Sequence, residues 1–160
     1  MLGDLLVELV HHYSPSTQER EAVSYLVGWM ATHGFQAYRD EVGNAVGIHG
    51  AADAPNTLML LGHIDTYPGE IPVRIEDGCL YGRGSVDAKG SLCAFADAAA
   101  IATIPDSWRV VVIGALEEEN ITSKGAVYAR ECFSPTMCVI GEPSGADRIT
   151  LGYKGRLVLQ

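Results

Sequence analysis

The sequence predicts one α/β domain built on a largely parallel central sheet, and three observations support this prediction. Short apolar runs of strand length alternate with stretches whose apolar residues recur at helical spacing. Some of these runs are apolar at every position, as expected for strands that are buried on both faces. The chain has 160 residues, 48% of them hydrophobic, which is enough to form one core without disulfide or metal cross-links.

The first third of the chain predicts two helices followed by short strands. Apolar residues at helical spacing indicate a first helix within residues 2–13. Ser16 followed three positions later by Glu19 has the spacing of a capping box, which predicts the start of a second helix that Gly34 ends. Strands are then expected at residues 36–40, 45–48 and 57–61.

The remaining elements continue the alternation of strands and helices. Asp77-Gly78 lies between apolar runs at residues 73–75 and 79–81, which predicts a β-hairpin. The Ala-rich residues 91–104 predict a buried helix that ends before Pro105. A strand at 110–115, a helix at 123–132 and a strand at 137–140 are expected to follow. Helices between successive strands favour parallel pairing.

Composition narrows the classes of partner. The sequence has 11 Lys and Arg against 20 Asp and Glu, a net charge of -9, and its basic residues are scattered singly. This argues against nucleic acid and anionic membranes as partners. Because no apolar run approaches the ~20 residues of a membrane span and the N-terminus lacks a basic leader, we predict a soluble cytoplasmic protein. Its four cysteines are expected to be buried free thiols, since none forms a C-x-x-C pair.

Potential metal ligands follow the predicted strands directly. They are His63 and Asp65, Asp87, the triplet Glu117–Glu119, and Glu142. Each has a simpler explanation when taken alone: a structural histidine, a helix N-cap, a solvated acidic patch and a turn residue. Because the carboxyl ends of parallel strands meet at one edge of a sheet, we expect them to converge. Their combined negative charge would then require a bound cation.

The donor types indicate which cation such a site would prefer. Imidazole nitrogen and carboxylate oxygens without a thiolate suit catalytic zinc, with manganese or cobalt as substitutes. Asp65 stands two residues after His63, and therefore on the same side of an extended backbone. We expect it to accept a hydrogen bond from the imidazole and so to orient the ring.

Four motifs in order carry a resemblance to a known family. G-H-x-D at residues 62–65, G-R-G-x-x-D-x-K-G at 82–90, an acidic doublet within 117–119 and G-E-P-S at 141–144 resemble the zinc aminoacylase and carboxypeptidase superfamily. Its members include acetylornithine deacetylase and succinyl-diaminopimelate desuccinylase. The resemblance implies a three-layer, zinc-peptidase-like catalytic domain that hydrolyses a linear amide bond with two divalent metal ions.

The resemblance also implies metal ligands. His63 would bind one metal, Asp87 would bridge both, and Glu142 would complete the protein ligands of the first. Glu119 would bind the second metal. A second histidine ligand for that metal would come from a part of the enzyme outside these 160 residues.

Two further roles follow from the resemblance. Glu118 would be the general base that takes a proton from the attacking water, and Asp65 would orient the ligating histidine. The triplet leaves the register open, because Glu117 and Glu118 could instead be base and ligand. We favour the later pair, since the family motif is often an acidic residue followed by two glutamates.

The resemblance to one subgroup of this superfamily implies a class of substrate. Residues 65–73, Ala88 and residues 117–126 resemble the lysine and ornithine deacylases of bacterial and archaeal lysine or arginine biosynthesis. The implied partner is an N-acyl-amino acid or an acidic amino-group carrier protein, which a net charge of -9 should repel. A dipeptidase or aminoacylase of the same family, and a non-catalytic metal-binding fragment, stay open as alternatives.

The same resemblance implies that the chain contains parts of two domains. Residues 1–148 would be the N-terminal part of the catalytic domain, and residues 149–160 the start of an inserted lid and dimerisation domain. The full-length protein would be a homodimer. The 160 residues alone are expected to be inactive, because a ligand and the substrate pocket would be missing.

Overall fold

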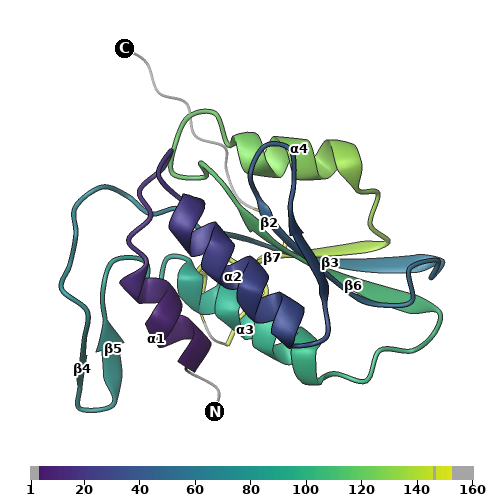
Figure 1. Cartoon of the computed structure of the whole chain (residues 1–160), viewed down its shortest axis with the longest axis horizontal. Helices are drawn as coiled ribbons and strands as arrows, with labels where there is room; N and C mark the ends of the chain where they lie inside the picture. The colour runs from purple at the N-terminus through teal and green to yellow at the C-terminus, as the bar shows by residue number, and fades with distance from the viewer. Residues whose placement is uncertain (1–3, 146, 153–160) are drawn as a thin grey trace.

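The computed structural model describes residues 4–145 and 147–152, which form an α/β fold (Figure 1). The helices are α1 (Asp4–His11), α2 (Arg20–Thr32), α3 (Lys89–Ile101) and α4 (Lys124–Cys132). The main sheet contains β1 (Gln36–Arg39), β2 (Ala45–Gly50), β3 (Asn56–His63), β6 (Trp108–Ala115) and β7 (Met137–Ile140). A separate hairpin is formed by β4 (Arg74–Glu76) and β5 (Cys79–Tyr81).

The main sheet is mixed but mostly parallel, as predicted. Its strand order is β1-β2-β6-β3-β7. β3 pairs in parallel with both β6 and β7, whereas β2 is antiparallel to β1 and to β6. Four strands therefore run in the same direction and only β2 opposes them. The carboxyl ends of β3, β6 and β7 consequently meet at one edge.

Helices cover both faces of this sheet and complete the three layers (Figure 1). On β6, Val110 and Val112 contribute to the apolar cluster that contains residues of α1, α2 and α3. Val111 and Ile113 face the opposite side, in the cluster that contains Ala129 of α4. This alternation explains why residues 110–115 of β6 are all apolar and buried: successive side chains enter two different cores.

Two glycines bring α3 close to the sheet near the carboxyl ends of the strands. Gly62 of β3 and Gly114 of β6 are paired in register. A Cβ on Gly62 would lie 3.1 Å from Cβ of Leu92, and one on Gly114 would lie 3.2 Å from its Cδ2. The missing side chains let α3 pack against the strands, which brings the residues just before α3 to the end of β3.

The predicted capping box is wrong. The cap residue of α2 is Glu19, and it makes no side-chain cap hydrogen bond. Ser16 instead donates its hydroxyl to Oδ2 of Asp65 at 2.6 Å, across 49 residues of sequence. The charge-assisted hydrogen bond that Ser16 donates to a buried carboxylate is stronger than the neutral one that it would accept from a helix N–H, which explains the different outcome.

The cysteines are free, as expected, but only Cys93 is buried. Cys79 lies on the hairpin, Cys132 ends α4 and Cys138 lies on β7, and all three are exposed. β7 is the edge strand of the sheet, and each of its four residues is exposed. The prediction of burial is therefore wrong for these three cysteines.

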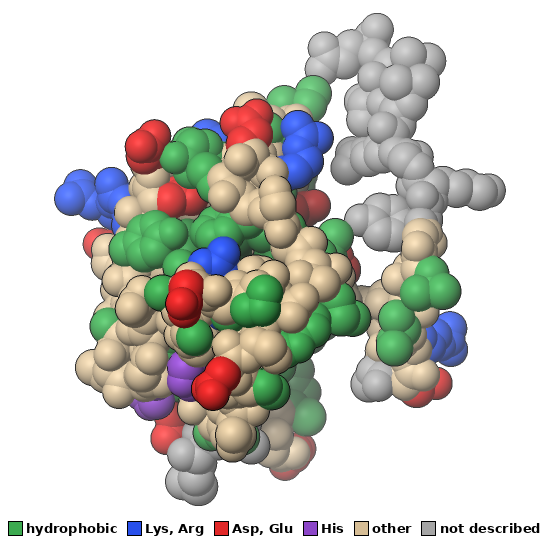
Figure 2. All heavy atoms as spheres, turned by 90° about the vertical axis from the view of Figure 1, so that its right-hand side faces the viewer, with side chains coloured by type: hydrophobic (Ala, Val, Ile, Leu, Met, Phe, Trp, Pro, Cys, Tyr) green, Lys and Arg blue, Asp and Glu red, His purple; other side chains and the backbone are tan. Residues whose placement is uncertain are grey.

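Two other expectations concern the surface and the C-terminus. None of the helices within the described part of the chain is long and apolar enough to cross a bilayer. On the face shown in Figure 2, acidic and basic side chains are interspersed with hydrophobic ones. Of the expected lid segment, residues 149–152 form neither helix nor strand, and residues 153–160 lie outside the described residues.

Candidate metal centre

The predicted ligands lie at the shared carboxyl edge of the three parallel strands. His63 is the last residue of β3, the Glu117–Glu119 loop follows β6, and Glu142 follows β7. The pairs His63–Ala115 and Leu61–Ile140 are in register, which brings the three strand ends close together. Asp87 reaches the same place from the loop before α3.

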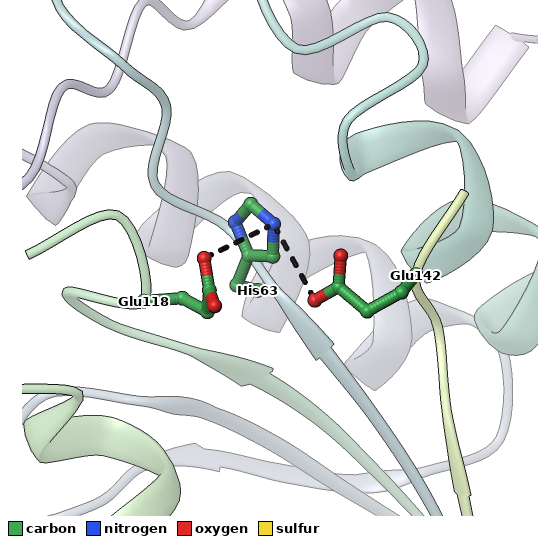
Figure 3. Close-up of side chains that lie close together, drawn as sticks. All are labelled: His63, Glu118 and Glu142. Carbon is green, nitrogen blue, oxygen red and sulfur yellow. Dashed lines mark ion pairs between the residues drawn. The ribbon is translucent and has the colours of Figure 1, made fainter. Parts of the chain in front are cut away.

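The imidazole of His63 is surrounded by carboxylates. Its Nε2 lies 3.0 Å from Oδ1 of Asp87, 3.8 Å from Oε2 of Glu118 and 3.9 Å from Oε1 of Glu142. Figure 3 shows His63 between the last two side chains, with both acidic groups directed toward the same ring nitrogen. His63, Asp87 and Glu142, which are far apart in sequence, therefore meet.

Two groups of side chains are close enough to hold a metal ion. Ligand atoms of His63, Glu118 and Glu142 all lie within 4.8 Å of one another, and so do those of His63, Asp87 and Glu119. Because both groups include His63, they form one continuous centre rather than two separate sites. Asp87 does not cap α3, whose cap residue is Ala88.

The histidine is buried and its orientation is defined by Asp65. Nδ1 of His63 lies 2.9 Å from the backbone oxygen of Asp65, which can only accept, so Nδ1 carries the hydrogen. We expected the Asp65 carboxylate in this role, but its Oδ1 lies 3.5 Å away. Burial disfavours the imidazolium, yet hydrogen bonds and charge from Asp65, with the charge of Glu118, raise the pKa of His63 to about 9.

Asp65 is fully buried and accepts several hydrogen bonds. Its oxygens accept the hydroxyl of Ser16 and the backbone N–H groups of Glu118 and Glu119, the latter two at 3.0 Å. Burial alone would raise the pKa of this carboxyl, but the nearby His63 imidazole and the hydrogen bonds from Ser16 and the two amides lower it. Asp65 thus connects the end of β3 to the loop after β6.

The three glutamates of the triplet do not point the same way. Oε1 of Glu117 lies 2.7 Å from Nζ of Lys124, and its Oε2 accepts the hydroxyl of Thr122 at 2.7 Å. These two partners lower the pKa of Glu117. Glu118 and Glu119 are the members of the triplet that reach the candidate metal groups.

The centre carries more negative charge than its protein partners balance. Burial and neighbouring carboxylates raise the pKa of both Glu119 and Glu142, although His63 partly opposes this. Within the described residues, the ion pairs of Asp87, Glu118 and Glu142 all involve His63. One imidazolium cannot neutralise four carboxylates. The surplus charge and the mixed nitrogen and oxygen donors fit divalent cations such as zinc.

Open grooves give access to the centre on both sides of the Gly82–Asp87 loop. One, of about 400 Å³, is lined by Tyr67, this loop and Glu119. The other, of about 480 Å³, is lined in part by Ser85, Ser91 and Glu142. Asp87, Glu119 and Glu142 are therefore accessible from these grooves.

Lys89 follows the motif aspartate, and its side chain is directed away from the centre. It is fully buried, and Nζ donates to the backbone oxygens of Leu9 and His12 at 3.1 and 2.7 Å. Burial lowers the pKa of Lys89 to about 8. Its contacts join the C-terminal end of α1 to the start of α3, which is a structural role.

Comparison with known proteins places this centre in a family. The model of peptidase family M20/M25/M40 matches residues 59–154, more than half of the chain and the whole stretch that carries the candidate ligands. The chain belongs to this family. The resemblance drawn from the four motifs is thereby confirmed at the level of the family.

Relatives within this family have a more specific name. A LysW-lysine hydrolase from Deinococcus radiodurans is 51% identical over 160 residues, covering 97% of this chain and 43% of that protein. A LysW-lysine/LysW-ornithine hydrolase from Saccharolobus islandicus is 30% identical over 161 residues, covering 98% and 43%. The chain therefore spans less than half the length of these relatives.

Solved structures share the fold. Aminopeptidase PepT from Bacillus cereus superposes with a TM-score of 0.74 at 21% identity, covering 90% of this chain and 43% of that one. At this identity the likeness supports the three-layer architecture and not a particular substrate.

Proposed function

We propose that this chain is the metal-carrying part of an amidohydrolase that releases lysine or ornithine from an N-acyl precursor in amino-acid biosynthesis. The observation that carries the proposal is the convergence of Asp87, Glu118, Glu119 and Glu142 on the imidazole of His63. The LysW-linked substrates in the names of its relatives favour a carrier-linked amino acid. Because those relatives are more than twice as long, the activity belongs to the whole enzyme.

The proposed ligand set comprises His63 and Glu142 for one metal, Glu119 for the second and Asp87 between them. Zinc is the proposed metal, with cobalt or manganese as substitutes. When bound, two such cations would lower the pKa of water and polarise the scissile carbonyl. The N–H on Nδ1 of His63 is engaged by the Asp65 backbone, which leaves Nε2 as the ligating nitrogen.

Glu118 is the proposed general base. Its side chain is 44% exposed and lies beside the candidate ligands, so it can accept a proton from the attacking water and deliver it to the leaving amine. Glu117 is a poorer candidate because Lys124 and Thr122 occupy both of its carboxylate oxygens. This supports assigning the base and the second metal ligand to the later pair of the triplet.

The proposed substrate is an amino acid held on an acidic carrier protein. The net charge of -9 opposes such a partner, so we propose that the remainder of the enzyme, including a lid domain used for dimerisation, supplies a basic face. A free N-acetyl-amino acid would need no such face.

The test is an assay of the full-length enzyme with zinc or cobalt. Carrier-linked lysine, N-acetyl-lysine, N-acetyl-ornithine and a few dipeptides are compared by kcat/KM. We expect the carrier-linked substrate to be preferred. Preference for a dipeptide would assign the enzyme to peptide hydrolysis instead, and the absence of turnover on every amide would leave only metal binding.

Glu118→Gln is the decisive variant of that enzyme. Replacing the proposed base should lower kcat by about 100- to 10,000-fold while metal content stays near wild type. Metal per chain is measured by elemental analysis on the same samples. Glu117→Gln is the matched control and should retain most of the turnover. Loss of one metal per chain in Glu118→Gln would move the base assignment to Glu117.

A further inference from the structure

The segment between α1 and α2, residues 14–19, lies alongside the backbone that follows β3. The hydroxyl of Ser14 donates to the backbone oxygen of Ile64 at 2.8 Å, and the N–H of Thr66 donates to the backbone oxygen of Ser14 at 2.9 Å. Pro15 and Thr66 form a parallel β-bridge. The segment is therefore attached on both sides of Asp65.

Two buried carboxylates hold three consecutive backbone amides of the acidic triplet. Glu19, which is 4% exposed, accepts the N–H of Glu117 at 3.2 Å. Asp65 accepts the next two, from Glu118 on Oδ1 and from Glu119 on Oδ2. The backbone that carries Glu118 and Glu119 is thus held from elements distant in sequence.

Ser16 connects these contacts. Its hydroxyl donates at 2.6 Å to Oδ2 of Asp65, the same oxygen that accepts the N–H of Glu119. Glu19, three residues later, also accepts the N–H of Thr17 at 2.9 Å, which orients its carboxylate. Neither side chain reaches the candidate ligands themselves.

We propose that Ser16 and Glu19 are positioning residues for the metal centre, acting through Asp65 and through the backbone of Glu117–Glu119. The inference rests on the proposed function in that the centre binds metal. Ser16 holds the Asp65 carboxylate in the rotamer that receives two loop amides. Glu19 holds the backbone N–H of Glu117, the residue before Glu118 and the second after the end of β6.

The first experiment tests this arrangement without metal. Hydrogen exchange of a peptide covering residues 117–119 is measured in the metal-free full-length enzyme. Ser16→Ala and Glu19→Ala should each accelerate its exchange by about 10-fold, the equivalent of one hydrogen bond to a charged group. Ser16→Thr, which keeps a hydroxyl, should restore protection. Unchanged exchange in both alanine variants would overturn the proposal.

The chain offers a matched control for each variant. Ser24 is exposed on α2 and donates its hydroxyl to the backbone oxygen of Arg20, and Glu21 is exposed in the first turn of the same helix. Ser24→Ala and Glu21→Ala should leave exchange of the triplet unchanged. Equal acceleration in the controls would mean that general destabilisation, and not positioning, causes the effect.

The second experiment measures cobalt and zinc affinity by calorimetry. Ser16→Ala should weaken binding by about 10-fold, as found when groups that orient metal ligands are removed, and lower kcat with KM unchanged. If wild type binds no metal while exchange still responds to Ser16, the proposed function fails and the loop arrangement stands. Wild-type affinity in Ser16→Ala would overturn the role of Ser16 at the centre.

Discussion

The two halves of the candidate centre differ in how the protein holds them. His63 and Asp65 are 2% and 0% exposed, contact each other, and are fixed by hydrogen bonds from two other segments, at Ser16 and at the Glu118–Glu119 loop. The side chains of Asp87, Glu118 and Glu142 are 56%, 44% and 36% exposed, and each has His63 as its ion-pair partner. The fold thus places the imidazole in advance and leaves like charges facing one another at the open side, where a cation would hold them.

The largest expected effect comes from removing a hydrogen-bond acceptor from the buried half of the centre, at Asp65. Asp65→Asn replaces one acceptor oxygen with an NH₂ group, which would face a loop N–H or the Ser16 hydroxyl. We expect metal affinity to fall by about 10- to 100-fold and the free energy of unfolding by about 1–3 kcal/mol. Metal titration and urea unfolding measure the two quantities. Asp53→Asn, at an exposed position, is the control.

A smaller effect on stability and metal binding is expected from changing the distance between the two halves of the candidate centre. A methyl group on Gly62 would meet Leu92 at 3.1 Å and displace α3, which follows Asp87. Gly62→Ala should lower the free energy of unfolding by about 1–3 kcal/mol through overpacking and should also weaken metal binding.

The control for this change is Gly28→Ala in α2, where a Cβ meets nothing within 4 Å. It should instead stabilise the protein by about 0.5–1 kcal/mol, because alanine is the better helix former. Thermal unfolding of both variants gives the comparison. Stabilisation by Gly62→Ala would contradict the close packing of α3 on β3.

The smallest expected effect has opposite signs with and without metal. Glu142→Gln removes one of the mutually repelling charges from the open half, so in the presence of a chelator it should stabilise the protein by about 0.2–1 kcal/mol. With metal present it should reduce metal affinity, because the carboxylate of a proposed ligand is lost. Unfolding curves with EDTA and with zinc separate the two states. Destabilisation in both conditions would show that the carboxylates do not repel one another.

The sequence by itself determined most of the elements and identified the side chains that form the candidate metal centre. β7 occupies the predicted residues 137–140, and β6 and α4 begin and end within two residues of expectation. The spacing of apolar residues suffices for this, because it is a local property of the sequence. Any helix or strand that packs against a core must show its own spacing. Family resemblance selected His63, Asp87 and Glu142. Parallel strand ends brought His63 and Glu142 together, and Asp87 joins them from the loop before α3.

Only the tertiary structure decided which partner each polar group took. Ser16 and Glu19 have the spacing of a capping box, yet they bind groups 49 and 98 residues away. Lys124 and Thr122 turn Glu117 from the centre, which separates it from Glu118 although the two are identical in type. A carboxylate or hydroxyl binds the best acceptor or donor within about 3 Å, and the chain must fold before that neighbour is known.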